Sequence, residues 1–326
     1  MRNFTFKGLF LTAVFMLLGC FSIQAADDDL ITKQITINLD KAGTLPNKIA
    51  SSEMYKITNL KIIGEINGTD WNMIREMAGR DNRGYGTEGK LSVLDLSEAK
   101  IVKGGDSYYS GDNCYTSNDE IGEYAFKDCS RLTSLTLPVG ITSIGYDAFA
   151  YCSGLTSLTL PAGITSIGEY AFSGCSGLTS LTLPAGITSI DKYAFSGCSR
   201  LTSLTLPAGI TSIGEFAFSY CSGLTSIYVY AEKVPRIGRY AFEGCASRKC
   251  TLYVPKGTYD NYRLSEFGYF ENIVEFDATG IDKTTTSTDV EEVSRYSADG
   301  QRLAVPVKGL NIVKYSDGSA RKVVVK

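Results

Sequence analysis

The chain contains no histidine and only one tryptophan among its 326 residues. The lack of imidazole excludes nucleophiles of the Ser-His-Asp and Cys-His types. It also excludes zinc sites with histidine ligands and acid–base catalysis by histidine. The sequence also has no GxSxG or Walker motif, and no C-x-x-C spacing of the kind that zinc sites use. We therefore expect a protein that is not an enzyme and that uses no cofactor or metal ion.

An excess of basic charge is absent as well. The formal net charge is −3, from 32 Lys and Arg against 35 Asp and Glu. Nucleic acids and anionic membrane surfaces are bound through a basic face, so we expect neither as a partner. The aromatic residues are instead mostly tyrosines, 20 in number, and tyrosine suits a surface that is both hydrated and able to bind.

Long apolar runs are missing except at the N-terminus. Arg2 and Lys7 precede an apolar stretch, Leu9–Leu18, which is too short to span a bilayer, and small residues follow at Ala25 and Ala26. We expect residues 1–26 to be a signal peptide that is cleaved near Ala26. Lipidation of Cys20 is the alternative, and either route predicts a secreted or outer-surface protein with no membrane span.

The remaining sequence is dominated by a 23-residue period. The segment from Leu155 reads LTSLTLPAGITSIGEYAFSGCSG, and the next unit differs from it at only three positions. A fixed short period with this leucine spacing is typical of a solenoid. Two residue types mark the period most clearly, with a step of 23 that becomes 24 at the last unit: Phe126, Phe149, Phe172, Phe195, Phe218 and Phe242, and Cys129, Cys152, Cys175, Cys198, Cys221 and Cys245.

Each unit has the composition of one coil. In a short strand, alternate side chains point to the same face, so Leu135 and Leu137 both face inward. Ile141 and Ile144 supply a second inward-facing apolar pair in the same coil. A short helical or irregular arc through Phe149 then closes the coil. Stacked coils bury both of their faces, which a single coil cannot do. The sequence thus predicts a leucine-rich-repeat solenoid of 23-residue repeats, with parallel β-strands and short arcs.

The chain divides into five segments on this pattern. After the signal peptide, residues 27–120 form an N-terminal cap with a diverged first repeat and a loop insertion at Lys103–Glu120, and Asp70 is expected to N-cap a helix in it. Residues 121–280 form the array and its C-terminal cap, closed by a helix within Tyr259–Phe267. Residues 281–289 form a linker, and residues 290–326 form a small all-β unit.

The repeat resembles that of the BspA-like leucine-rich-repeat bacterial surface proteins. The match is carried by the blocks Leu-Pro-x-Gly-Ile-Thr-x-Ile-Gly and Ala-Phe-x-x-Cys, and it covers about Leu91–Val254. The tail from Asp299 resembles, in a shortened form, the C-terminal sorting domains of type IX secretion. The resemblance implies surface display and adhesion to macromolecules of a host or neighbouring cell, and it names no ligand.

Tyrosines that recur beside the repeat markers are the candidate ligand-binding residues. An extended protein or glycan would gain most from contacts that are repeated along a rigid strip. Packing of these rings against neighbouring arcs, without any binding role, is the alternative. The five candidates are Tyr146, Tyr151, Tyr170, Tyr193 and Tyr220.

The repeated cysteines are expected to be buried, reduced thiols, because stacked side chains point the same way and cysteine behaves as a small hydrophobic residue in cores. A bridge between Cys245 and Cys250 is the alternative. The acidic loops at Asp81 and at Asp106–Asp112 are expected to be solvated turns, since neither has the downstream Glu of an EF-hand.

The sequence therefore favours an exported, adhesin-like binding protein that presents a repetitive surface to an extracellular protein or glycan. A passive surface spacer is one alternative. A carboxylate-dependent glycan hydrolase that uses Asp119, Glu120 and Glu123 is another, although a regular solenoid offers no cleft for a glycosidase pair.

We predict that the exported chain begins near Ala26 or Asp27, because the small residues before the acidic run mark the cleavage site. Intact-mass measurement and N-terminal sequencing of the exported protein check this. A mature N-terminus at a diacylated Cys20 would replace signal-peptide cleavage by lipoprotein processing.

Overall fold

The computed structural model describes residues 29–278, 292–297, 302–303, 309–315 and 320–325. The chain forms two compact units, Met1–Val274 and Glu275–Lys326. The expected signal peptide, Cys20 and the expected linker at 281–289 lie outside the described residues.

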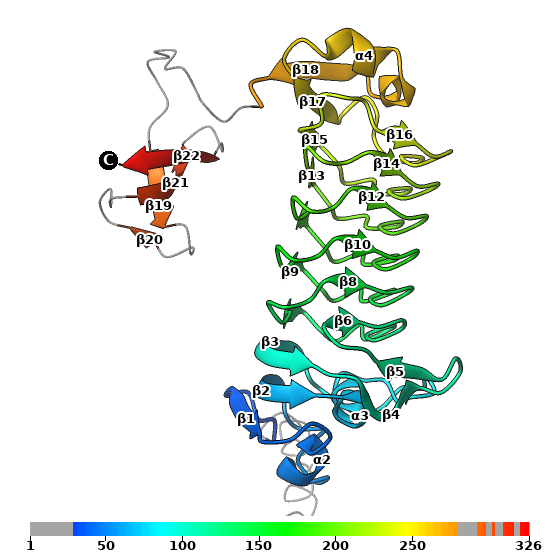
Figure 1. The fold of residues 1–326 in the computed structure, drawn as a ribbon, viewed down its shortest axis with the longest axis vertical. Coiled ribbons are helices and arrows are strands. Elements are labelled where there is room, and N and C mark those ends of the chain that lie inside the picture. The colour runs from blue at the N-terminus through cyan, green and yellow to red at the C-terminus, as the bar shows by residue number, and fades with distance from the viewer. Residues whose placement is uncertain (1–28, 279–291, 298–301, 304–308, 316–319, 326) are drawn as a thin grey trace, which may run out of the picture. The chain divides into compact units, whose positions relative to one another are not determined.

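The first unit is a parallel β-solenoid with LRR-like coils, as the sequence predicted (Figure 1). Its main face consists of two consecutive five-stranded sheets. The first contains β1 (Ile35–Leu39), β2 (Asn59–Ile66), β3 (Val93–Ile101), β7 (Ser134–Thr136) and β9 (Ser157–Thr159). The second contains β11 (Ser180–Thr182), β13 (Ser203–Leu206), β15 (Ser226–Val229), β17 (Thr251–Pro255) and β18 (Asn272–Phe276).

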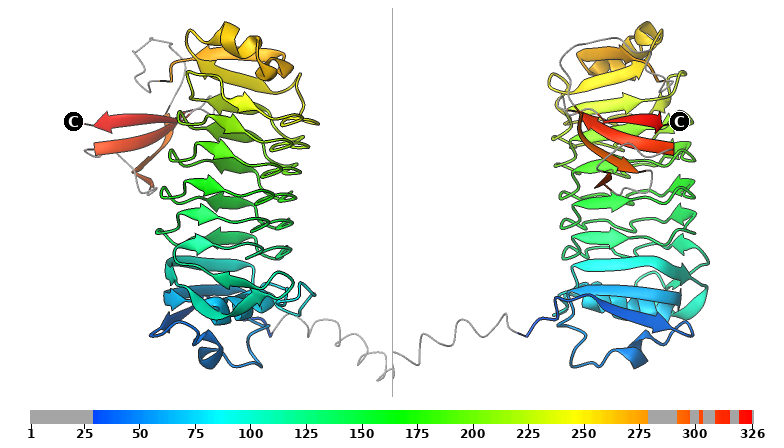
Figure 2. Two further views of the ribbon diagram at one scale, coloured as in Figure 1. Left: turned by 45° about the vertical axis from the view of Figure 1, so that its right-hand side comes forward. Right: turned by 90° about the vertical axis from the view of Figure 1, so that its left-hand side faces the viewer.

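Stacking continues across the boundary between these two sheets. The Thr179 N–H donates to the Thr156 carbonyl at 3.2 Å, as the Thr202 N–H does to Thr179 at 3.0 Å. A second face carries shorter strands in two further sheets, and Figure 2 shows both faces along the array. These strands are β6 (Glu120–Ile121), β8 (Ser143–Ile144) and β10 (Ser166–Ile167), then β12 (Ser189–Ile190), β14 (Ser212–Ile213) and β16 (Arg236–Ile237).

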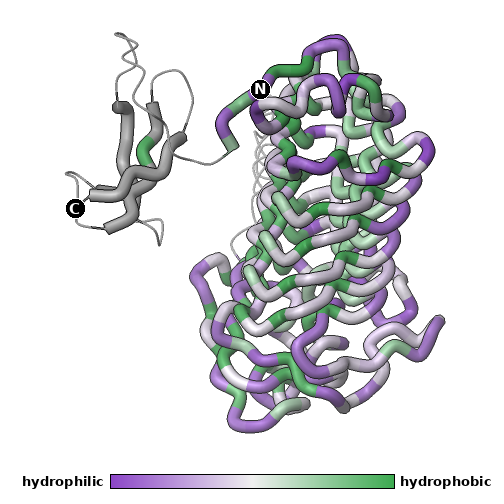
Figure 3. Tube along the Cα trace, turned by 45° about the horizontal axis from the view of Figure 1, so that its top comes forward, coloured by the Kyte–Doolittle hydropathy of each residue, from purple (hydrophilic) through white to green (hydrophobic). Residues whose placement is uncertain are grey.

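The 23-residue period places like residues in register. Leu135 pairs with Leu158 and Leu181 pairs with Leu204, so hydrophobic segments recur in line along the array (Figure 3). The predicted inward positions are confirmed, since Leu135, Leu137, Ile141 and Ile144 are all buried. The repeated phenylalanines form a central column from Phe126 to Phe242, with successive ring centroids 5.0–5.5 Å apart.

The arcs between the two faces form a third hydrogen-bonded ladder. The Phe149 N–H donates to the Ala171 carbonyl at 2.7 Å, and the Phe172 N–H donates to Ala194 at the same distance. Bonds on either side follow the same step, so alternate residues of each arc donate to the next coil. The arcs are thus not loops over the core, because their backbone groups are satisfied by their neighbours.

The N-terminal cap contains α2 (Leu45–Lys48) and α3 (Gly68–Met77). The prediction that Asp70 N-caps the second helix was wrong, because Asn67 is the N-cap and Asp70 is the third helical residue of a capping box. The buried Asp70 carboxylate also accepts the N–H groups of Gly43 and Leu45, at 2.6 and 2.8 Å. It therefore fixes two chain segments together.

Three cap side chains close the carbonyl edge of the first arc. In the array, the carbonyls equivalent to Glu123 and Ala125 accept from the preceding coil. Here the Trp71 Nε1–H and the Arg75 Nη1–H donate to the Ala125 carbonyl at 3.0 and 2.9 Å, and the Tyr108 hydroxyl donates to Glu123 at 3.0 Å. All three side chains are buried. Their burial follows from the need to pair carbonyls that have no preceding arc.

The Lys103–Glu120 insertion contains a hairpin, and a compact end closes the array. The hairpin pairs β4 (Gly104–Tyr109) with β5 (Cys114–Thr116). At the other end, the predicted closing helix is split into α4 (Tyr259–Arg263) and the 3-10 helix η1 (Glu266–Tyr269). Phe267 and Phe270 pack on Phe242 at 5.8 and 5.3 Å, whereas β18 rather than a helix lies beside β17.

The second unit is a four-stranded antiparallel sheet in the order β20-β19-β21-β22. Its strands are β19 (Glu292–Ser297), β20 (Arg302–Leu303), β21 (Gly309–Tyr315) and β22 (Ala320–Val325). Val313 is buried in this sheet.

The repeated cysteines are buried and free, as the sequence predicted. Cys152 Sγ donates to the Phe126 carbonyl of the preceding coil at 3.0 Å, and Cys175 Sγ donates to Phe149 at 3.1 Å. Cys245 and Cys250 are also free thiols, so the bridge between them is not formed. Burial raises the pKa of Cys129 to about 11 and that of Cys175 to about 12, which leaves little of the reactive thiolate at neutral pH.

We predict that Phe172→Ala lowers the free energy of unfolding by about 3–5 kcal/mol, because the change leaves a cavity between two stacked rings. Denaturant unfolding checks this. The exposed Val139→Ala, which should change stability by less than about 0.5 kcal/mol, is the control. A loss below about 1 kcal/mol at Phe172 would contradict its place in the core.

We also predict that the repeated cysteines are alkylated at pH 8 only after denaturation, and without a reductant. Burial and the raised thiol pKa protect them in the native protein, where a Val139→Cys variant supplies an accessible thiol for comparison. Intact mass after alkylation counts the modified residues. Three or more disulfides among them would overturn the assignment as core thiols.

Candidate functional site

Seven aromatic side chains form a continuous row along the arcs. The ring centroids of consecutive members lie 4.6–5.8 Å apart, and the three contacts between Tyr170 and Tyr240 are stacked, with interplanar angles of 3–29°. We call this set the aromatic row. Its members, in order along the array, are Tyr109, Tyr124, Tyr146, Tyr170, Tyr193, Phe216 and Tyr240.

The backbone of the arc sets the direction of these rings. Tyr170 and Tyr193 have φ values of 57° and 56°, in the left-handed region that bulky residues rarely adopt. The following Ala and Phe turn into the core, so the aromatic residue before them is left at the outer edge. Because every coil repeats this geometry, each ring stacks on the equivalent ring of the next coil.

Tyr146 reaches the same row from a different backbone position. In its coil the left-handed residue is Asp147, with φ of 53°, and Tyr146 precedes it. The Tyr146 ring therefore meets Tyr124 and Tyr170 edge-on, at interplanar angles of 73° and 74°. Asp147 in turn accepts from Lys127 Nζ at 2.5 Å, and that ammonium group lies 4.9 Å from the Tyr124 ring centroid.

The row is partly exposed along its length. The rings of Tyr146, Tyr170 and Tyr193 are half-buried, and Tyr240 at the end is 60% exposed. Desolvation raises the pKa of Tyr146 and of Tyr170, with nearby acidic and tyrosine groups adding to the shift. The hydroxyls of Tyr146 and Tyr170 therefore stay protonated at neutral pH and can donate hydrogen bonds.

Tyr151 and Tyr220 lie outside the row, one step before the buried cysteines. Their φ values are 60° and 57°, at a position that glycine occupies in three other coils, at Gly174, Gly197 and Gly244. A Cβ on Gly174 would come within 2.6 Å of the Tyr151 ring, so that ring packs against the backbone of the next coil at Gly174. Both tyrosines are more than half exposed, at 57% and 59%.

The structure thus brings together three of the five candidate tyrosines and places the other two in a separate line. It adds Tyr124, Phe216 and Tyr240 to the row, and their position before Ala-Phe is visible in the repeat. Tyr109 gave no such signal, because it comes from the β4–β5 hairpin.

The acidic groups are used in local structure. Asp81 accepts the N–H groups of Arg83 and Tyr85 at 2.9 and 2.7 Å, which makes it the centre of a turn. Among the described residues, no group of three or more metal-binding side chains could hold an ion. Of the three carboxylates considered for hydrolysis, Glu120 and Glu123 are exposed and Asp119 is half-buried at the start of a regular coil.

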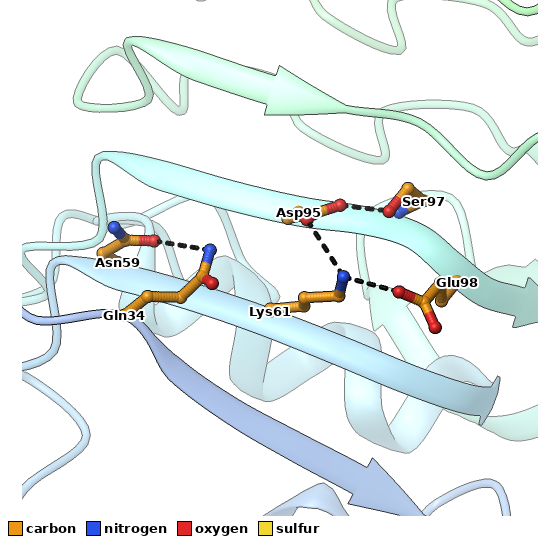
Figure 4. Close-up of polar contacts among 6 residues, drawn as sticks. All are labelled: Gln34, Asn59, Lys61, Asp95, Ser97 and Glu98. Carbon is orange, nitrogen blue, oxygen red and sulfur yellow. Dashed lines mark hydrogen bonds and ion pairs between the residues drawn. The ribbon is translucent and has the colours of Figure 1, made fainter.

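A charged cluster on β2 and β3 belongs to the cap sheet (Figure 4). Lys61 Nζ lies 2.6 Å from Glu98 and 3.6 Å from Asp95, and Gln34 donates to Asn59 at 3.4 Å. Burial alone would raise the pKa of Asp95, but hydrogen bonds from Ser97 and the charge of Lys61 lower it. The paired charges bridge neighbouring strands, an arrangement that stabilises a sheet.

Within the described residues, no helix has the length and apolar character needed to cross a bilayer.

Comparison with protein families finds six copies of the BspA type leucine rich repeat region at residues 119–249. Comparison with curated proteins finds no match. Among solved structures, the chain is similar to a leucine rich repeat protein of T. pallidum, with 30% identity and a TM-score of 0.40 over 45% of this chain and 65% of that one.

Two further structures are similar. One is a leucine rich cell surface protein from Faecalibacterium prausnitzii, with 28% identity and a TM-score of 0.35 over 48% of this chain and 45% of that one. The other is the pneumococcal vaccine antigen PcpA, with 16% identity and a TM-score of 0.39 over 75% of this chain and 68% of that one. The matches thus span less than two thirds of the first two proteins. The repeats at residues 119–249 thus match the BspA type leucine rich repeat region.

Proposed function

We propose that the protein is an exported, non-enzymatic binding protein that holds an extended protein or glycan along the aromatic row. The observation that carries this proposal is the row itself, in which partly exposed rings repeat at every coil from Tyr109 to Tyr240. The N-terminal sequence features support export. We also propose that the tail acts as a sorting signal for type IX secretion, as its resemblance suggests. A chain without residues 290–326 should then stay in the cell.

The geometry of the row favours a polymeric ligand. Its rings are held in place by their neighbours and by the arc ladder, so little further entropy is lost when a ligand contacts them. Contacts that repeat at the coil spacing of about 4.8 Å reinforce one another through effective concentration only if the ligand extends along the array. A small molecule would contact one or two rings and would gain little from the repetition.

Tyr151 and Tyr220 are the second candidate surface within this proposal. Each holds a large exposed ring at a left-handed position where glycine would be free of strain. Strained residues are retained where a role offsets their cost. The two rings are three coils apart, which corresponds to about 14 Å at the usual strand spacing.

We predict that replacing Tyr170 and Tyr193 by Asn, singly and together, weakens binding progressively, by a factor of about 5 for each ring, which corresponds to about 1 kcal/mol. Asn tolerates the left-handed backbone and removes only the ring. Tyr146→Ser extends the series, with serine in place of asparagine because the backbone of Tyr146 is not in the left-handed region. Binding to an array of immobilised glycans and fibrous proteins, together with a melting curve for each variant, measures both effects.

The controls separate the two surfaces from each other and from the scaffold. Tyr151→Gly and Tyr220→Gly introduce the residue that other coils have, and they report on the second surface alone. Tyr115→Ser removes an exposed ring from the hairpin and should change nothing. Unfolding of the Asn variants would show that the row is packing. If folded variants of both surfaces bind normally, the binding site lies elsewhere, and the Lys103–Glu120 insertion is the next candidate. If the unaltered protein binds nothing on the array, a passive spacer is favoured.

A further inference from the structure

The arc ladder has a direction. At every internal coil, the N–H groups of alternate arc residues point toward the C-terminal end, where the next arc supplies the carbonyls. The N–H groups of Tyr193, Phe195 and Gly197 donate to Glu215, Ala217 and Ser219 at 3.0, 2.8 and 2.7 Å. The arcs therefore end differently at the two ends of the array: one end presents carbonyls and the other presents N–H groups.

Most of the carbonyl end is paired, whereas the N–H end is unpaired among the residues that the structure describes. The cap pairs Ala125 and Glu123 with Trp71, Arg75 and Tyr108, as described above. At the other end, the N–H groups of Tyr240, Phe242 and Gly244 donate no hydrogen bond among the described residues. We call these three donors the open arc edge.

A cavity of about 340 Å³ lies against this edge, lined by the arc from Ile237 to Glu243 and by Glu266 and Tyr269 of η1. The reason for the cavity is visible in the packing. Phe267 and Phe270 continue the central column of rings above Phe242, so the core of a further coil is filled. Among the described residues, no segment forms the outer part of that coil, which would supply three carbonyls and a ring over Tyr240.

The charged residues that line the cavity indicate which kind of ligand could bind there. Glu243 and Glu266 line it together with one basic residue, Arg239, which disfavours an anion. The three donors also belong to alternate residues, at most about 7 Å apart for each step, so they match a row of backbone carbonyls better than one compact group. Tyr240, whose ring is stacked on Phe216 at 5.1 Å, is 60% exposed, and no further ring of the described residues stacks on its other side.

We propose that the open arc edge binds an extended peptide segment of another protein, whose backbone carbonyls pair with the three N–H groups and whose aromatic side chain stacks on Tyr240. Addition of a chain segment to an unpaired backbone edge is a known mode of peptide recognition. This site lies at the end of the array, goes beyond the proposed function and does not rest on it. A second copy stacked head to tail is disfavoured, because the cap already pairs two of the three carbonyls that such a copy would offer, those of Glu123 and Ala125.

The array itself indicates a probe for the test. A synthetic peptide with the sequence of Ser166–Gly174, SIGEYAFSG, reproduces an arc that pairs with such an edge inside the array. Site-resolved amide hydrogen exchange of the full chain, with and without this peptide, reports on each donor. We expect the amides of Tyr240, Phe242 and Gly244 to exchange at least about tenfold faster than those of Tyr193, Phe195 and Gly197, and to be protected when the peptide is present.

Two comparisons make the test specific. A peptide with alanine in place of its tyrosine and phenylalanine, and a Tyr240→Ala variant, should each weaken the protection about tenfold or more, whereas Tyr115→Ala should not. Protection of the three amides without any peptide would show that the edge is already closed. A peptide at millimolar concentration that leaves them unprotected, or that protects other amides instead, would also overturn the proposal. None of these results depends on the aromatic row binding a polymer.

Discussion

Hydrogen bonding between neighbouring coils is the constraint on which the rest of this structure depends. A coil of 23 residues has no helix and no strand partner of its own, so its backbone groups are paired only when another coil lies on either side. Three ladders provide this pairing: the main sheets, the short second-face strands and the arcs. They hold the coils in register, and the register places phenylalanine on phenylalanine and the repeated thiols from Cys152 to Cys245 on the carbonyl of a preceding phenylalanine.

The same constraint explains the two ends. Carbonyls with no preceding arc require donors, and the cap supplies them from buried Trp71, Arg75 and Tyr108, which is an unusual use of a charged side chain in a core. Arg75 contacts backbone carbonyls of Tyr124 and Ala125 and lies 5.4 Å from the Tyr109 ring centroid. At the far end, Phe267 and Phe270 fill the apolar column, but no described residue accepts from the N–H groups of the last arc. An array with directional ladders therefore has two chemically different ends.

Sequence predicted the inward half of each coil well, because periodicity reports directly on buried side chains such as Leu135 and Phe172. It was less informative on the outward half. The left-handed position recurs every 23 residues, at Asp147 and Tyr170, but the ring of the earlier coil is carried one residue before it, at Tyr146. A shift of one residue in the place of a tyrosine changes the direction of its ring and leaves the periodic pattern almost unchanged. The five candidate tyrosines are accordingly distributed over two lines. Asp70 was misassigned because a capping box places its acidic residue three positions inside the helix, and Tyr109 joins the row through a long-range contact that no local pattern encodes.

The aromatic row is a consequence of the arc ladder, since only a backbone fixed by hydrogen bonds can hold bulky residues in left-handed conformations coil after coil. Site-resolved amide hydrogen exchange of the free protein tests this account most directly. We expect the Phe149, Phe172 and Phe195 amides in the arcs to be as strongly protected as those of Thr179 and Thr202 in the main face, because both sets donate to a neighbouring coil. Arc amides that exchange as fast as those of an irregular surface loop, beside protected strands, would contradict it.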